Sequence, residues 1–210
     1  YVSRSTGWAM TETCSIGSSM GDRIYDDRPD SAGLVSPIVD LRMVDDEGNV
    51  VPDGEEGEIE CNGVTMTPGY WRRPDATAEI YHGDWLRTGD VGRLDEEGFL
   101  YITGRVKDIV IRGGENIFPG EVEDVAYSHE AIEEVCIFGV PDDALGEVLA
   151  MVYFSPGKGI DHSELETYIS DRLGSFKVPK YISASNESLP LNLSGKIDKK
   201  VIRDDFLSKL

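Results

Sequence analysis

The stretch GRVKDIVIRGGENIFPGEVE, residues 104–123, lies where two kinds of sequence pattern meet. Within it, DIVIR is rich in β-branched residues and predicts a short strand. The pair Gly113 and Gly114 follows, and glycine lets another chain or a narrow ligand approach the backbone closely. Pro119 is typical of the first residue of a helix. A hairpin turn that leads into a helix would explain the same residues without any site.

The composition changes at the same place. All eight lysines lie at or after Lys107, whereas every Lys or Arg before it is an arginine. The first 104 residues carry 8 arginines against 21 acidic residues. Such a shift indicates two units. We therefore predict a first unit over residues 1–106 and a second over residues 107–210, with Lys107 as the hinge between them.

The first unit has the pattern of a β-rich, turn-rich structure. Residues 40–51 and 58–63 predict strands around a Glu-Gly-Asn turn, and residues 92–104 predict a hairpin with alternating aromatic residues after a glycine turn. Residues 66–77 (MTPGYWRRPDAT) hold proline and glycine too densely to predict regular elements.

The second unit alternates between strand and helix patterns. Buried strands are predicted over residues 133–140 and 147–155, and a further strand over residues 180–185. Helices are predicted after Pro119 and over residues 161–174 and 198–210. For the middle helix, Asp161 and Glu164 predict a capping box and Gly174 predicts the end. The chain as a whole is therefore predicted to be α+β.

Charge and cysteine content exclude several classes of protein. With 40 acidic against 20 basic residues, the net charge of −20 argues against nucleic acid or an anionic membrane surface as the main partner. Cys14, Cys61 and Cys136 are far apart, which favours a reduced chain in the cytoplasm. No apolar run approaches the roughly 18 residues of a membrane helix, so no integral membrane segment is expected. The chain starts at Tyr1, and we expect it to be a piece of a longer protein.

The stretch STGWAMTETCS, residues 5–15, is a candidate nucleotide-binding segment. Trp8 could expose a flat ring to a nucleobase, and Thr11 could donate a hydrogen bond to a phosphate. Glu12 offers one hard carboxylate, which Mg²⁺ usually combines with substrate phosphates and water. A core tryptophan followed by a threonine helix cap is the structural alternative.

Three further side chains could bind a nucleotide. Asp90, in a Thr-Gly-Asp turn, could accept hydrogen bonds from both ribose hydroxyls, or it could bond its own backbone. Arg105 is a fork-shaped donor for ribose or phosphate. Lys196 follows Ser194 and Gly195 in LSGKI, which is not a phosphate loop because the residue after the lysine is neither Ser nor Thr. The structural alternative for Lys196 is an exposed loop lysine.

Taken together and in this order, the motifs GWAMTET, WLRTGD, GRVKDIVIRGGENIFPGEVE, LGSFKVP and LSGKI resemble the adenylate-forming superfamily. This family includes acyl-CoA synthetases, peptide-synthetase adenylation domains and firefly luciferase. The resemblance runs from about Gly7 to the C-terminus. It implies a distorted β-barrel-like subdomain over about residues 31–104, followed by a small mobile α+β domain. Trp8 and Ala9 depart from the family pattern, which usually has Tyr-Gly there.

The resemblance also implies a role for each candidate residue. Those that would contact the nucleotide and its metal are Gly7 and Trp8 at adenine, Thr11 at phosphate, Glu12 at Mg²⁺, and Asp90 and Arg105 at the ribose. In the second unit, Gly114 would line the pantetheine tunnel of coenzyme A. Lys196 would be catalytic, since a cation offsets the repulsion between a carboxylate and the α-phosphate of ATP.

The implied activity is that of an acyl-CoA synthetase, which uses ATP to turn a carboxylic acid into an acyl-adenylate and then transfers the acyl group to coenzyme A. Loading of a carrier protein, or a non-catalytic module that binds a nucleotide or a partner, are the alternatives. The phosphate loop of the family would lie upstream of Tyr1, so we expect the chain alone to be inactive. We also expect residues 1–30 to be poorly supported, with Trp8, Met10 and Ile16 lacking burial partners.

Overall fold

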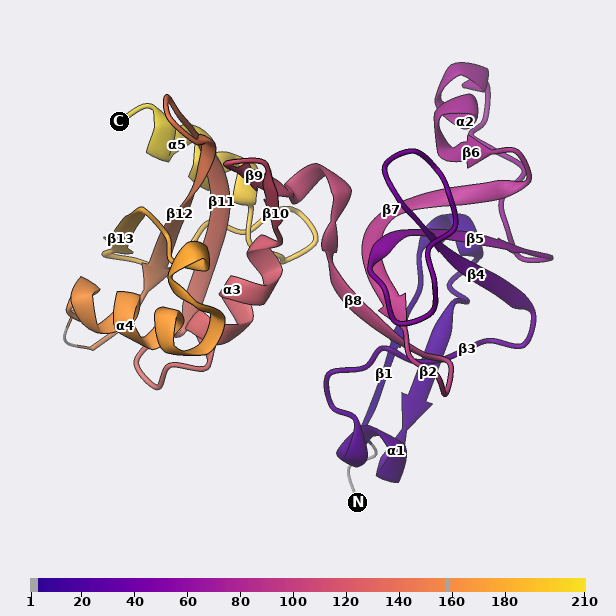
Figure 1. Cartoon of the computed structure of the whole chain (residues 1–210), viewed down its shortest axis with the longest axis horizontal. Helices are drawn as coiled ribbons and strands as arrows, with labels where there is room; N and C mark the ends of the chain where they lie inside the picture. The colour runs from indigo at the N-terminus through magenta and orange to yellow at the C-terminus, as the bar shows by residue number, and fades with distance from the viewer. Residues whose placement is uncertain (1–3, 158) are drawn as a thin grey trace. The chain divides into compact units, whose positions relative to one another are not determined.

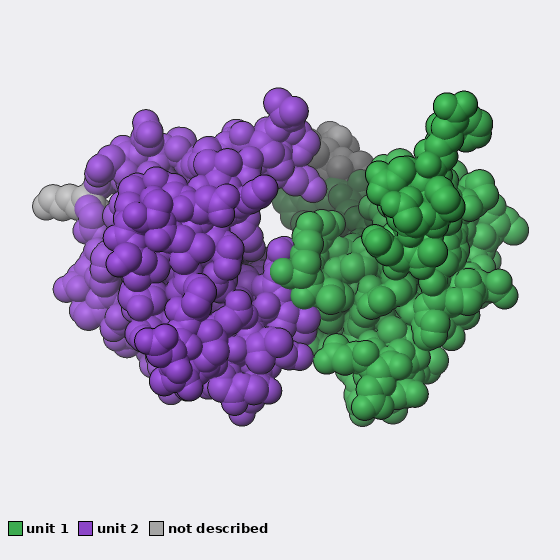
Figure 2. Space-filling view, turned by 90° about the horizontal axis from the view of Figure 1, so that it is seen from above, with its two compact units in different colours: residues 1–107 green, residues 108–210 purple. Residues whose placement is uncertain are grey.

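The computed structural model describes residues 4–157 and 159–210. The chain divides into two compact units, Tyr1–Lys107 and Asp108–Leu210, coloured green and purple in Figure 2. The division falls one residue after the predicted position. Both units combine strands with helices (Figure 1), so the predicted α+β class is confirmed. Across the described residues, no helix is long and apolar enough to cross a membrane.

Unit 1 is built on an eight-stranded sheet in the order β1-β2-β3-β8-β7-β5-β4, with β6 paired to β7. Its strands are β1 Ser5–Trp8, β2 Ser18–Gly21, β3 Gly33–Val35, β4 Val39–Val44, β5 Gly57–Gly63, β6 Tyr81–His82, β7 Trp85–Leu94 and β8 Phe99–Arg105. All neighbours pair antiparallel. Within the described residues this path ends at β1 and at β4, so the expected barrel-like subdomain is an open sheet rather than a closed barrel.

Short helices connect the strands of unit 1. They are the 3₁₀ turn η1 Thr11–Thr13, α1 Asp22–Asp27 and α2 Pro74–Ile80, with η2 Val106–Asp108 after β8. The helix α2 corrects the prediction that residues 66–77 hold no regular element. Proline and glycine are dense only before it, and Pro74 itself occupies the first helical turn, where a missing N–H costs nothing.

The N-terminal segment is better supported than expected. Trp8 is only 8% exposed and belongs to the core of unit 1, and Met10 and Ile16 pack against that core. The burial partners come from strands later in the chain, including Ile59 of β5 and Leu86 of β7. The expectation that Trp8, Met10 and Ile16 lack partners is therefore wrong, because the sheet of unit 1 itself supplies them.

Unit 2 is a five-stranded sheet covered by helices. The order is β10-β9-β12-β11, and β13 pairs with β12 in parallel. The strands are β9 Val110–Arg112, β10 Glu115–Ile117, β11 Glu134–Asp142, β12 Gly146–Phe154 and β13 Tyr181–Ser185. The helices are α3 Pro119–Tyr127, α4 His162–Leu173 and α5 Lys199–Leu207, with the 3₁₀ turn η3 Ser175–Lys177.

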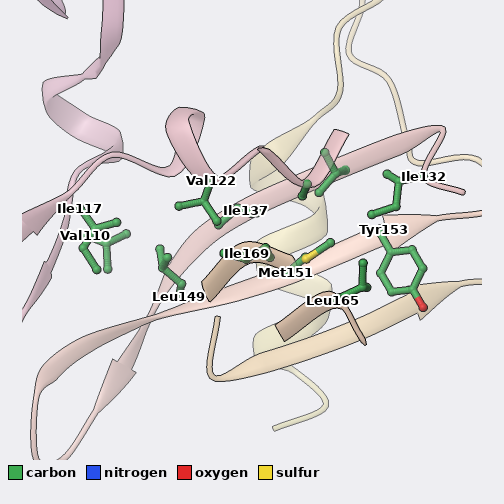
Figure 3. Close-up of a cluster of buried hydrophobic side chains, with 12 residues drawn as sticks. Val110, Ile117, Val122, Ile132, Ile137, Leu149, Met151, Tyr153, Leu165 and Ile169 are labelled. Atoms are coloured by element: carbon green, nitrogen blue, oxygen red, sulfur yellow. The ribbon is translucent and has the colours of Figure 1, made fainter. Parts of the chain in front are cut away.

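The middle of the strand β11, residues 135–138, is apolar, and both of its faces are buried there. Val135 and Ile137 belong to the cluster that includes residues of α3 and α4, drawn in Figure 3. Cys136 and Phe138 belong to a second cluster, which includes Ile202 of α5. Successive side chains of a strand point to opposite faces, so a sheet with helices on both sides requires an unbroken apolar run.

The start of α4 differs from the prediction in one detail. Asp161 caps the helix, accepting a hydrogen bond from the Ser163 N–H at 3.0 Å. The Glu164 side chain does not complete a capping box; its Oε1 instead lies 3.6 Å from Nε2 of the buried His129. Gly174 ends the helix with φ of +82°, as its position predicts.

The core of unit 2 can be tested at Leu165, which is fully buried in α4. Leu165→Ala should lower the free energy of unfolding of this unit by about 2–5 kcal/mol, because it removes apolar contacts and leaves a cavity. Hydrogen exchange of the β11 and β12 amides at increasing denaturant measures this. The exposed neighbour Glu166 gives the control, since Glu166→Ala should stay within about 0.5 kcal/mol. Equal losses in the two variants would contradict the assigned core.

Candidate functional site

Three of the predicted residues meet around one buried carboxylate in unit 1. Trp8 ends β1, Asp90 lies in β7, and Arg105 ends β8 directly opposite Asp90 in the strand register. The Trp8 indole Nε1–H donates to Asp90 Oδ2 at 2.8 Å. Arg105 Nε lies 2.9 Å from the other oxygen, Asp90 Oδ1. We call this group the Asp90 cluster; its members are Trp8, Asp90 and Arg105.

The backbone around Asp90 is also held in place. Its N–H donates to Thr88 Oγ1 at 3.1 Å, and the Thr88 hydroxyl donates to the Ile59 carbonyl at 2.7 Å. The pairing of β7 with β8 shifts register between Val91 and Gly92, next to Asp90. Such bulges re-aim side chains. The Asp90 carboxylate therefore bonds Trp8 and Arg105, and not its own backbone as the structural alternative supposed.

The Asp90 cluster can still accept further donors. An ionised carboxylate has about four lone-pair sites; Asp90 Oδ2 accepts one hydrogen bond from Trp8, and Oδ1 lies in an ion pair with Arg105. The Asp90 residue is 8% exposed, whereas the Arg105 side chain is 55% exposed. A fixed acceptor beside an exposed guanidinium suits a ligand that carries neighbouring hydroxyls and phosphate, as a nucleotide does.

Glycines let the backbone around Trp8 pack closely. A Cβ atom on Gly7 would lie 2.5 Å from the Ser18 carbonyl oxygen of the paired strand. A Cβ atom on Gly17 would lie 2.4 Å from Cε3 of the Trp8 ring. Gly7 is therefore required by the pairing of β1 with β2, and its contact with a base stays a prediction. Stacking of Trp8 on adenine also stays a prediction. One part of the Trp8 ring already lies against Gly17, so a base would have to contact another part of the ring.

Glu12 is held by a residue that the sequence patterns did not single out. The Tyr70 hydroxyl donates to Glu12 Oε1 at 2.6 Å, and the Thr67 N–H donates to the Glu12 carbonyl at 2.7 Å. The hydrogen bond from the Tyr70 hydroxyl to Glu12 raises the pKa of Tyr70 above its ordinary value of 10.0. Thr11, beside Glu12 in η1, is exposed. Tyr70 lies in the proline-rich stretch 66–77, where no periodicity relates it to Glu12.

A single carboxylate, that of Glu12, is the candidate metal ligand in this region. Among the described residues, no group of three or more His, Cys, Asp and Glu side chains could hold a metal by itself. Glu12 is half-buried and accepts one hydrogen bond, so it has free acceptor sites. This fits Mg²⁺, which usually takes one or two carboxylates and completes its shell with phosphates and water.

The other predicted residues lie at the unit boundary and in unit 2. Lys107 is exposed in η2, at the last position of unit 1. Gly113 and Gly114 form the turn between β9 and β10 with φ of +60° and +91°. Two positive φ values are typical of the tight turns that favour glycine. A Cβ atom on Gly114 would meet nothing within 4 Å, so its face is open within the unit.

Lys196 stands on a turn that one side chain organises. The Asn192 Oδ1 accepts hydrogen bonds from the Ser194 N–H at 2.9 Å, the Ser194 hydroxyl at 2.7 Å and the Lys196 N–H at 3.1 Å. A bridge between Leu191 and Ile197 closes the turn. The backbone of Lys196 is thus fixed by Asn192, a residue that sequence reasoning did not select.

The Lys196 side chain is free to act outside this turn. Over residues 4–157 and 159–210, no ion pair of its ammonium group is found, and the residue is exposed. Lys199, three residues later, pairs with Glu123 at 3.1 Å. An unpaired cation on an ordered turn is available for an anionic ligand.

Comparison with known proteins gives the family. The family described as "AMP-binding enzyme" matches residues 3–71, and "AMP-binding enzyme C-terminal domain" matches residues 121–196. A feruloyl-CoA synthase of an Amycolatopsis species is 40% identical over 202 residues, which are 95% of this chain and 41% of that protein. The chain therefore belongs to the adenylate-forming superfamily, as its motifs predict.

Solved structures agree with this assignment. The amide bond synthetase of Marinactinospora thermotolerans matches with a TM-score of 0.88 and 31% identity, covering 96% of this chain and 42% of that one. The o-succinylbenzoate CoA synthetase of Bacillus subtilis, solved with its acyl-adenylate intermediate, matches with a TM-score of 0.87 and 34% identity, over 95% of this chain and 41% of that one. The chain thus spans about two fifths of the length of the relatives that it matches.

The contact between Glu12 and Tyr70 makes a prediction about pH. In the variant Glu12→Gln, the pKa of Tyr70 should fall back toward 10.0, because the charged acceptor that raises it is gone. Since the pKa is raised in the folded state, the stability from this contact is complete below the ordinary pKa and is lost as the pH rises through the raised value.

Tyrosine-selective NMR titration of Tyr70 measures this change. Tyr81 is the internal control, because burial is the main cause that raises its pKa, and it should titrate alike in both proteins. An unchanged titration of Tyr70 in Glu12→Gln would show that the contact is absent.

Proposed function

We propose that the protein carrying this chain is an ATP-dependent acid–thiol ligase, which converts a carboxylic acid to an acyl-adenylate and then transfers the acyl group to coenzyme A. The observation that carries this proposal is the Asp90 cluster. It combines a fixed carboxylate with an exposed guanidinium on the neighbouring strands β7 and β8, and Trp8 joins them from β1, which is far away in sequence. The family membership and the CoA synthetases among the relatives support it.

Unit 1 would bind the nucleotide. Asp90 would accept hydrogen bonds from the ribose hydroxyls, and Arg105 would donate to the ribose or a phosphate. Trp8 and Gly7 would lie at the adenine, and Thr11 at a phosphate. Glu12, oriented by Tyr70, would hold Mg²⁺, which when bound neutralises phosphate charge.

Lys196 would act in the first step. An oxygen of the acid attacks the α-phosphorus of ATP, the bond from that phosphorus to the bridging oxygen breaks, and pyrophosphate leaves. Two anions approach one another in this step, so a cation that reaches both lowers the barrier. The exposed ammonium of Lys196, free of ion pairs among the described residues, suits this role.

Gly114 would act in the second step. The thiol of coenzyme A attacks the acyl carbonyl, and AMP leaves with the electron pair of the broken acyl–phosphate bond. We propose that the second unit rotates about Lys107 between the two steps. Lys196 would then leave the nucleotide, and the turn at Gly113 and Gly114 would take its place, with the pantetheine arm passing beside it. The two residues therefore serve different half-reactions.

A second candidate differs in the acceptor. In this candidate the acceptor of the acyl group is an amine, as the amide bond synthetase among the similar solved structures suggests. A carrier-protein thiol is the third acceptor to compare. Supplying the complete gene product with acid, ATP and each acceptor in turn separates these cases. A thioester of coenzyme A as the main product supports the proposal, and an amide or an acylated carrier overturns this part of it.

The two half-reactions give a crossed prediction in the complete gene product. Lys196→Ala should slow acyl-adenylate formation by about 10²–10³-fold, as expected for one removed electrostatic stabiliser. It should spare thioester formation from a supplied acyl-adenylate. Gly114→Trp should do the reverse, because it fills the open turn and leaves Lys196 in place. Rapid-quench assays of each half-reaction measure both effects.

Two matched variants control this experiment. Lys200→Ala removes another exposed lysine, and Gly174→Trp places the same bulk at a glycine with a similar φ of +82° and open space around it. Both should leave the two half-reactions nearly unchanged. If Lys196→Ala slowed both steps equally, or neither, Lys196 would have no catalytic role.

A further inference from the structure

We propose that Trp8 is a positioning residue, whose indole N–H holds the Asp90 carboxylate in the orientation that binds the ribose. This inference rests on the proposed function and assigns Trp8 a role beyond contact with the base. It comes from the observed hydrogen bond between Trp8 Nε1 and Asp90 Oδ2, at 2.8 Å between two residues that are each 8% exposed.

The position of the Trp8 ring is itself fixed. Trp8 pairs with Ser18 in the ladder between β1 and β2, and its backbone N–H donates to Ser18 Oγ at 3.2 Å. The ring lies so close to Gly17 that a Cβ atom there would be 2.8 Å from Cζ3. A ring held on this side and along its backbone cannot turn its N–H elsewhere without repacking the core. The donor is therefore preorganised.

The two donors of the Asp90 cluster reach different oxygens. Arg105 Nε forms an ion pair with Oδ1, and the Trp8 indole N–H donates a hydrogen bond to Oδ2. Without the indole, nothing else described holds Oδ2, and a free carboxylate beside a guanidinium tends to rotate into a two-bond pair with it. That rotation would turn both oxygens toward Arg105 and away from a bound ribose. The indole N–H thus keeps Oδ2 turned away from Arg105, where its remaining lone pair can accept from a ribose hydroxyl.

The chemistry of the ring makes the proposal testable. Phenylalanine keeps a flat face for stacking but has no N–H, so Trp8→Phe separates the two roles. A hydrogen bond to a charged group corresponds to an effect of about 10- to 100-fold on an equilibrium constant. The substitution should therefore raise KM for ATP by about 10-fold or more, with a smaller change in kcat.

The decisive comparison uses 2′,3′-dideoxy-ATP, which lacks both ribose hydroxyls. In acid-dependent adenylate formation by the complete gene product, wild type should prefer ATP over the dideoxy nucleotide strongly. In Trp8→Phe this preference should shrink by about 10-fold, because Asp90 no longer grips the hydroxyls. An equal KM penalty with both nucleotides would mean that Trp8 acts on the base alone, and it would overturn the proposal.

An NMR measurement needs no turnover, so it tests the proposal even if Trp8→Phe fails to fold. In indole-¹⁵N-labelled protein, Asp90→Asn should move the Trp8 Nε1–H proton resonance upfield, because a charged acceptor is replaced by a neutral one. The Trp71 indole, 84% exposed, is the internal control and should not move. An unchanged Trp8 resonance overturns the proposal. Failure of acid-dependent adenylate formation in wild type would instead count against the proposed function, so the two failures are distinguishable.

Discussion

A carboxylate that is removed from water must be matched by donors, and in unit 1 this constraint applies to Asp90 as it does to the buried Glu60, which pairs with Arg42. The Trp8 indole contacts one oxygen of Asp90 and the Arg105 guanidinium the other. These residues come from β1 and β8, the first and last strands of unit 1. Removing either donor would leave a buried charge poorly compensated, which is more costly than losing a surface contact. The position of β1 against β7 and the chemistry of the candidate site therefore depend on the same few atoms.

The candidate residue of unit 2 is held differently. Lys196 lies on an exposed turn, and its order comes from the three hydrogen bonds that Asn192 accepts and not from burial of the lysine. In the function that we propose, a buried acceptor for the nucleoside and an exposed cation on a separate unit have different tasks. The first has to bind without reorganisation, and the second has to reach an anion in one step and leave it in the next. This division agrees with the two half-reactions that we propose.

The elements that local rules control were predictable from the sequence. The apolar runs of β11 and β12, the cap at Asp161 and the glycine that ends α4 all follow from periodicity or backbone preference. Contacts between distant segments were not. Trp8 and Asp90 are 82 residues apart, and nothing in either motif indicates that the indole N–H meets the carboxylate. The contact of Tyr70 with Glu12, and the open edges of the sheet, likewise depend on how strands assemble.

The same limit explains the wrong expectations. Trp8 was expected to lack burial partners because it would normally pack into a part of the protein upstream of Tyr1, yet it belongs to one core cluster with Ile59 and Leu86. Glu164 was expected to complete a capping box on its own helix, but its carboxylate lies beside His129, in the turn that follows α3. In both cases a tertiary contact decides the outcome that a local pattern leaves open.

The central claim is that the buried carboxylate of Asp90 is the ribose-binding group. A crystal structure of the complete gene product with AMP tests it most directly, through the distances from the two Asp90 carboxylate oxygens to the ribose hydroxyl oxygens. We predict that at least one distance lies within about 2.6–3.2 Å while the Trp8 indole still donates to Oδ2. A bound AMP whose ribose hydroxyls contact other residues, with Asp90 out of hydrogen-bond reach, would contradict the account.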